Sequence, residues 1–261
     1  MADRYTSRIA LVLDQPLVDV GEVVRAAIAA GDLDRAGPIG SGAQAQEVNW
    51  GGRMDKAAVR TLEEDGDDLL RVEAYIGGDG PVKGMQRQAV LVQTLARQLR
   101  GCVRTVRDLS AHVERDEAWI NRLAVGAVEH DDAIATRDRG EGTHWVHTYG
   151  AARFDVPDLE LYGLTKSQAA AAPGVLRHVH EQLLARGLKA DLTLPGGEPV
   201  YLVPVLDAWG DLPFDWPGVG KAGVSRGPGL DGPRATLSLL HPPRLGKYKR
   251  DYKGITTTLP R

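Results

Sequence analysis

The pattern of apolar and polar positions along the chain predicts short strands that alternate with amphipathic helices. Continuous or alternating apolar residues predict strands at Arg8 to Leu13, Leu69 to Ile76, Cys102 to Leu109 and residues 188–194, 200–206 and 234–240. Apolar residues at helical spacing predict helices over residues 20–30, 84–99, 109–130 and 174–186. Residues 57–62 fit a helix or a strand equally well.

This order of elements predicts an α+β fold with two α/β sandwich-like halves. The first half alternates strands with helices, and a ferredoxin-like arrangement is one candidate for it. A dinucleotide-binding fold fits less well, because Asp14, Gln15 and Pro16 stand where a glycine-rich turn would follow the first strand. The second half predicts a mainly antiparallel sheet with covering helices.

Changes in composition along the chain suggest where the halves meet. We expect an N-terminal α/β half over residues 1–109 and a C-terminal α+β half over residues 143–261. Residues 110–142 are expected to form a helical bridge that ends in a charged, glycine-rich linker. The C-terminal half contains a long loop rich in Gly, Pro and Trp at residues 209–233 and ends in a basic tail.

The tract from Thr143 to Leu164 is the part of the chain that carries most of the candidate chemistry. Its composition predicts two strands, which an antiparallel hairpin would pair so that opposite residue numbers sum to about 307. This register places Trp145 opposite Tyr162, His147 opposite Glu160, and Tyr149 opposite Asp158. These six residues would share one face of the hairpin, and Val146, Leu159 and Leu161 would lie on the other, core-facing side.

His147 beside Glu160, with Asp158 on the same face, is a candidate catalytic set. A carboxylate next to an imidazole can orient the ring, raise its pKa or share a metal with it. The alternative is a polar cross-strand pair on a half-solvated sheet, which contributes about 0.2–1 kcal/mol. His144 and His147 fall on opposite faces of a strand, so they do not predict a shared metal, and we expect neither a metal nor a cofactor.

The same tract resembles a segment in a group of uncharacterised bacterial domains of unknown function. In that group a Trp-x-His-Thr-His-Gly stretch is followed by Pro-Glu-Leu-Glu. The corresponding residues here are Trp145, His147, Thr148 and Gly150, then Pro157, Asp158, Leu159 and Glu160. Tyr149 replaces the second His and Asp158 replaces a Glu. The resemblance implies a fold context, since the group has no agreed activity.

Composition and charge narrow the classes of partner and compartment. The chain has 261 residues, a formal net charge of −3 and a single cysteine, Cys102, so no intramolecular disulfide can form. Such a small charge gives no reason to expect a strongly charged partner. No signal peptide opens the sequence and no apolar run is long enough to span a bilayer, so we expect a cytoplasmic protein without membrane contact.

The absence of known catalytic sequence motifs favours a binding function over an enzyme. The sequence has no nucleophile elbow, phosphate loop, paired-cysteine metal site or HExxH helix. We therefore expect a non-catalytic, macromolecule-binding protein with a protein partner, and two groups of aromatic residues as its contact surface. These are Trp145, Tyr149 and Tyr162 of the hairpin, and Trp209, Phe214 and Trp216 of the long loop.

Two other functions remain open from the sequence. The first is a hydrolase or metal-assisted enzyme that uses the hairpin face with His147 and Glu160. The second is nucleic-acid binding through the basic tail, where five lysines and arginines alternate with Tyr248 and Tyr252.

Overall fold

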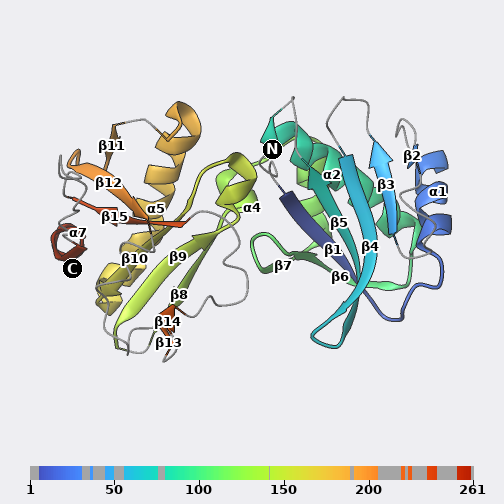
Figure 1. Ribbon diagram of the computed structural model, residues 1–261, viewed down its shortest axis with the longest axis horizontal. Coiled ribbons are helices and arrows are strands. Elements are labelled where there is room, and N and C mark those ends of the chain that lie inside the picture. Colours follow the sequence, from blue (N-terminus) through green and yellow to red (C-terminus); the bar gives the residue numbers. More distant parts are fainter. Residues whose placement is uncertain are drawn as a thin grey trace. The chain divides into compact units, whose positions relative to one another are not determined.

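The computed structural model shows two compact units, Met1–Ala133 (unit 1) and Ile134–Arg261 (unit 2). It describes residues 6–30, 36–37, 45–49, 56–75, 80–140, 142–188, 191–204, 219–220, 223–224, 234–239 and 252–259. Each unit has its own sheet and helices (Figure 1) and is described by itself. Within these ranges no helix combines the length and the apolar character that crossing a bilayer requires.

Unit 1 is a seven-stranded sheet with helices. Its elements are, in chain order, β1 (Thr6–Leu13), α1 (Val20–Ala30), β2 (Ala36–Gly37), β3 (Ala45–Asn49), β4 (Lys56–Glu64), β5 (Asp67–Tyr75), α2 (Pro81–Gln98), β6 (Val103–Asp108), β7 (Val113–Arg115), α3 (Glu117–Ala124) and α4 (His130–Ala133). The strands lie in the order β2-β3-β4-β5-β1-β6-β7, and neighbouring strands are antiparallel. The path β1-α1-β4-β5-α2-β6 has the βαββαβ connections of a ferredoxin-like fold, with β2, β3 and β7 added at the edges.

β1 lies in the interior of this sheet, and its sequence is apolar on both faces. Ile9, Ala10, Leu11 and Val12 are all fully buried, and β1 pairs with β5 on one side and β6 on the other. A strand that alternated apolar and polar residues would expose one face to water. The apolar run at Arg8 to Leu13 therefore indicates an interior strand.

The β4–β5 hairpin shows that the segment whose sequence fits a helix or a strand equally well is a strand. Residues 57–62 belong to β4, which pairs with β5 along its whole length from Lys56 to Glu64. The two strands are joined through Asp65 and Gly66, whose φ angles are 54° and 80°. Positive φ at both central positions matches the twist of the flanking strands, and an Asp-Gly pair is a favoured sequence for it. The turn thus supplies the signal that periodicity alone did not.

Helix α2 covers the sheet with the apolar stripe that the sequence predicts. Met85, Ala89 and Val92 are fully buried on this stripe, whereas Ala96 near its end is only half-buried. Between them, the fully buried Gln88 donates from Nε2 to the backbone oxygens of Ser7 and Val72, both at 2.8 Å. One side chain therefore ties the helix to β1 and β5 at once.

The expected helix over residues 109–130 is wrong for most of its length. The structure has strand β7 at Val113–Arg115 and helix α3 only at Glu117–Ala124. β7 extends the sheet by pairing with β6, and Asp116 then caps α3 by accepting from the amide of Trp119 at 2.8 Å. The boundary between the units falls within the range 110–142, with α4 in unit 1 and the strand from Ala135 in unit 2.

Unit 2 is a mainly antiparallel sheet with covering helices, as expected. Its elements are β8 (Ala135–Arg139), β9 (His144–Tyr149), η1 (Ala151–Phe154), β10 (Asp158–Leu164), α5 (Lys166–Arg186), β11 (Leu192–Thr193), β12 (Pro199–Pro204), β13 (Val219–Gly220), β14 (Gly223–Val224), β15 (Arg234–Ser238) and α7 (Tyr252–Thr258). The larger sheet has the order β11-β12-β15-β10-β9-β8, in which β10 and β15 are the parallel pair. α5 packs on β9 and β10, and α7 packs on β10 and β15. The α+β class is confirmed.

Helix α5 is longer than the sequence suggests, since it starts at Lys166 and continues through Pro173. Thr165 and Gln168 form a reciprocal capping box, which satisfies free amides at the helix start. Pro173 lies on the exposed side of the helix. His180 follows the buried Leu176 by four residues; it is fully buried, and its Nε2 lies 3.1 Å from the backbone oxygen of Pro157.

One edge of the unit 2 sheet is closed by a side chain of α5. Gln182 donates from Nε2 to the backbone oxygen of Thr193 at 2.8 Å, and its Oε1 accepts from the Thr193 amide at 3.0 Å. The primary amide thus makes the pair of hydrogen bonds that a neighbouring strand would make with β11.

Replacing Gln88 with Leu removes both donors that link α2 to β1 and β5. Because the acceptors are buried backbone oxygens, we expect the free energy of unfolding to fall by about 1–3 kcal/mol for each group left without a partner. Urea unfolding measures the change. Gln98→Leu, on the exposed side of the same helix, is the matched control and should change stability by less than about 0.5 kcal/mol. Equal stability of the two variants would contradict the bridging role.

Candidate functional site

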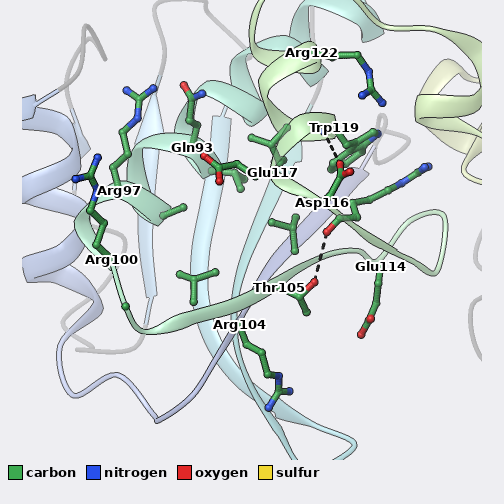
Figure 2. Close-up of a pocket in the computed structure, with 17 residues that line it drawn as sticks. Gln93, Arg97, Arg100, Arg104, Thr105, Glu114, Asp116, Glu117, Trp119 and Arg122 are labelled. Atoms are coloured by element: carbon green, nitrogen blue, oxygen red, sulfur yellow. Dashed lines mark hydrogen bonds between the residues drawn. The ribbon is translucent and has the colours of Figure 1, made fainter.

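Unit 1 contains a groove between α2, α3, β6 and β7, shown in Figure 2, which we call the α2–α3 groove. Its volume is about 940 Å³, which lies within the range of about 300–1,000 Å³ typical of ligand sites. The apolar part of its lining comes from α2, β6 and α3: Val92, Ala96, Val103, Val106 and Ile120. Val92, Val106 and Ile120 are themselves buried and form the floor, so the apolar surface that a ligand side chain can contact comes mainly from the half-buried Ala96 and Val103.

Charged groups stand on two sides of the groove. Arg97 and Arg100 extend from the end of α2, and Glu117 lies at the start of α3 (Figure 2). All three side chains are exposed. Within the described ranges none of them forms an ion pair or a side-chain hydrogen bond. They are therefore available to a ligand without first breaking a contact of the protein.

Other arginines of the groove are already engaged. Arg104 hydrogen-bonds Asp67, which also accepts from Arg107 at 2.8 Å, and Arg122 donates to Asp132 at 2.9 Å. The hydrogen bonds from Arg107 and Arg104 hold the pKa of Asp67 below its usual value of 3.8. These arginines position β6 and α3, so they differ in role from Arg97 and Arg100.

Trp119 fixes the α3 side of the groove. Its ring is almost fully buried and donates from Nε1 to the backbone oxygen of Asp132 at 3.0 Å. The guanidinium of Arg115 lies 5.0 Å from the ring centroid, a distance at which a cation–π interaction stabilises the pair. Together with the Asp116 cap, these contacts hold α3 in one position against α2.

In unit 2 the hairpin tract forms, with two of the three predicted pairs in place. His147 lies opposite Glu160 and Trp145 opposite Tyr162 in the antiparallel pair of β9 and β10, whereas the ladder does not extend to Tyr149 and Asp158 and its register shifts next to His144. The expectation of one core face and one half-solvated face is wrong. His147 and Glu160 are fully buried, and so are residues such as Val146 on the other face. The structure thus brings the predicted catalytic pair together, but in the interior of unit 2.

The predicted cluster is held by contacts among its own members. Trp145 donates from Nε1 to Oε2 of Glu160 at 3.1 Å, and its ring stacks on His147 with centroids 4.1 Å apart. Nε2 of His147 lies 2.9 Å from the hydroxyl of Tyr149. Arg139 also donates to this hydroxyl at 3.3 Å. Trp145, Tyr149 and Tyr162 are all buried, so they do not form an exposed contact face.

Asp158, the third candidate catalytic residue, accepts hydrogen bonds from neighbouring groups of the hairpin. Its Oδ1 accepts from the amide of Ala151 at 3.1 Å and lies 3.3 Å from Oγ1 of Thr148. The same Thr148 hydroxyl accepts from the amide of Leu159 at 2.8 Å. Asp158 therefore secures the connection through η1 between β9 and β10.

His144 does not belong to this buried cluster. His144 pairs with Asp138 at 2.7 Å on the neighbouring strand β8, away from the interior position of His147. No group of three metal-ligating side chains occurs in the part of the chain that the structure describes. Trp209, Phe214 and Trp216 lie outside the described residues, as does most of the basic tail.

Sequence reasoning missed the α2–α3 groove. The polar face of α2 carries Arg97 and Arg100, and nothing in its sequence shows that another element lies opposite. The one usable signal was Ala96, a small residue near the end of the apolar stripe. The groove needs β7 and α3, which the expected single helix over residues 109–130 concealed.

Comparisons of the chain with protein-family models, with curated proteins and with solved structures found no match. Function must therefore be argued from the geometry of the chain itself.

Replacing Asp67 with Asn should lower stability in a pH-dependent way. The folded-state pKa of Asp67 is lower than its unfolded value, so its contribution is present above pH 3.8 and is lost as the pH falls through the folded pKa. The difference between wild type and Asp67→Asn in urea unfolding should be largest near neutral pH and shrink below pH 3.8. Asp65→Asn, in the same turn, is the control, and an equal pH-dependent loss there would refute the assignment.

Replacing Trp145 with Phe removes a donor from the buried carboxylate of Glu160. We expect a loss of about 1–3 kcal/mol in the free energy of unfolding. A double-mutant cycle with Glu160→Leu, which has no acceptor, separates the pair interaction from the loss of ring volume. A coupling energy of about 0.5 kcal/mol or more is expected, whereas additive effects would show that the hydrogen bond does not stabilise unit 2.

Proposed function

We propose that the chain is a non-catalytic binding protein and that the α2–α3 groove of unit 1 holds a segment of a protein partner. The observation that carries the proposal is the composition of the groove: an apolar lining beside Arg97, Arg100 and Glu117, whose charges no described contact uses. A binding site needs apolar area for affinity and a few polar groups for orientation. The groove offers both.

The groove supports binding better than catalysis. Its titratable side chains are arginines, glutamates and Asp116, and Asp116 is engaged by the cap of α3. Among the lining residues there is no histidine, cysteine or serine to act as a nucleophile or as a base near neutral pH. Thr105 is the lining hydroxyl, and its Oγ1 lies 3.5 Å from the backbone oxygen of Arg115.

A hydrolase or metal-assisted enzyme that uses His147 and Glu160 is the second candidate. The observation in its favour is the confirmed register, which puts the two residues side by side. Their complete burial and their contacts with Tyr149 and Trp145 favour a role in holding unit 2 together instead. The binding proposal therefore takes precedence.

Filling the groove tests the proposal. Ala96→Trp places a large ring in the groove from the half-buried position on α2. Peptides selected from a displayed random library on the wild-type protein should bind this variant at least about tenfold more weakly, because the ring takes up the space of the ligand. Titration calorimetry measures the affinities, and thermal unfolding checks that the variant is folded.

Val82→Trp is the matched control, because Val82 is exposed on the same helix and lies outside the groove. It should leave peptide affinity unchanged within about twofold. If selected peptides bind the wild type and Ala96→Trp equally well, the groove is not the binding site. If the library yields no binder, the proposed function is refuted for peptide partners.

A further inference from the structure

The α2–α3 groove contains an open stretch of sheet edge. β6 pairs with β1 from Val103 to Asp108, with a register shift between Val103 and Thr105, but on its other side β7 covers only the part from Val106 to Asp108. Among the described residues no strand pairs with the outer side of Val103–Thr105, and these residues line the groove. An edge of this kind presents backbone N–H and C=O groups to any extended chain that lies beside it.

The open edge has a local cause in the sequence. β7 would continue along β6 if the chain stayed extended beyond Arg115. Instead Asp116 caps α3, and the chain turns away from the sheet as a helix. The edge next to Val103–Thr105 is therefore left uncovered, and α3 becomes a wall of the resulting space (Figure 2).

The unused charges lie on two parts of the chain that flank this edge. Arg97 lies in the last turn of α2, and Arg100 lies in the turn that leads into Val103. Glu117 begins α3, and its side chain reaches across the groove toward Gln93 of α2 (Figure 2). A chain lying along the edge would meet the positive charges where β6 begins and the negative charge of Glu117 on the α3 side.

We propose that the groove binds an extended segment of a partner protein as an added β-strand along Val103–Thr105. The segment carries carboxylates at the end near Arg97 and Arg100 and a lysine or arginine at the end near Glu117. Main-chain hydrogen bonds to β6 supply affinity, the apolar lining takes alternate side chains, and the charges set the direction of the segment. This inference rests on the proposed function and specifies its ligand.

The charge pattern selects a peptide over other occupants. A nucleic-acid backbone carries negative charge throughout and would meet Glu114, Asp116 and Glu117 on the β7 and α3 side, where Arg115 and Arg122 already contact Trp119 and Asp132. A second copy of this chain that paired through the same edge would have to insert an edge that itself lies within a groove between α2 and α3. A single extended segment fits such a recess without that obstacle.

The test uses synthetic peptides on the full-length protein. The probe is acetyl-Glu-Val-Glu-Val-Thr-Val-Lys-Val-Lys-amide, whose valines all share one face of a strand, and its partner peptide has every Glu and Lys exchanged. A third peptide has N-methyl groups on the central Val and Thr, which removes strand donors and leaves the side chains. The charge-exchanged and N-methylated peptides should each bind about tenfold more weakly than the probe.

Protein variants locate the interaction. Arg97→Glu with Arg100→Glu should weaken the probe about tenfold and should bind the charge-exchanged peptide no more weakly than the wild type does. Lys83→Glu makes the same kind of charge change on α2 outside the groove, and it should alter affinity by less than about twofold. Amide hydrogen exchange adds a direct readout, because the probe should protect at least one amide among Val103, Arg104 and Thr105.

Each outcome separates this inference from the proposed function. If the probe and its N-methylated form bind equally well and Ala96→Trp weakens both, the groove binds peptides but not by strand addition. Absence of binding by the probe at millimolar concentration also overturns strand addition, while library peptides blocked by Ala96→Trp would still support the groove. A dimer that dissociates in the Arg97→Glu, Arg100→Glu variant would identify a second copy as the occupant and refute the proposal.

Discussion

The carboxylate of Asp116 accepts a hydrogen bond from the backbone amide of Trp119, and the α2–α3 groove of unit 1 depends on that contact because it fixes where α3 begins. It sets the residue at which an edge strand ends and a helix begins. A cap of this kind stabilises a helix by only about 1 kcal/mol, but it favours one of two alternative paths of the chain. The chain either follows β6 or leaves it. Because it leaves, α3 faces α2 across a space and part of β6 has no neighbour.

Unit 2 shows how polar residues can occupy the interior of a sheet. β9 and β10 carry His147, Thr148, Asp158 and Glu160 in buried positions. Hydrogen bonds join these groups to Trp145, to Tyr149 and to the backbone of the η1 turn. Burying polar groups costs free energy unless each finds partners, and a network that satisfies them requires one arrangement of the strands. The polar character of this core therefore favours a single register over slipped alternatives.

The sequence was most informative where the physical signal is local. The apolar run of β1, the stripe of α2 and the alternation in β9 and β10 each follow from neighbouring residues, and the pairing of His147 with Glu160 was predictable from them. The helix expected over residues 109–130 failed because a three-residue strand has no periodicity to detect. The burial of both hairpin faces was unpredictable for another reason: it depends on elements outside the hairpin, such as α5, that pack on β9 and β10. The groove likewise exists only where α2, α3 and β6 meet.

The bidentate contact between Gln182 and Thr193 has a consequence for behaviour in concentrated solution. Sheet edges with unsatisfied main-chain groups recruit other molecules and begin aggregation. At β11 a primary amide from the protein's own helix occupies those groups, so a foreign strand must first displace it. At the opposite edge, Arg137, Asp138 and Arg139 of β8 are exposed, and charged side chains on an edge discourage self-association. Each edge of the larger sheet of unit 2 is thus protected from pairing with strands of other molecules. The side-chain amide of Gln182 protects one edge, and the charged side chains of β8 protect the other.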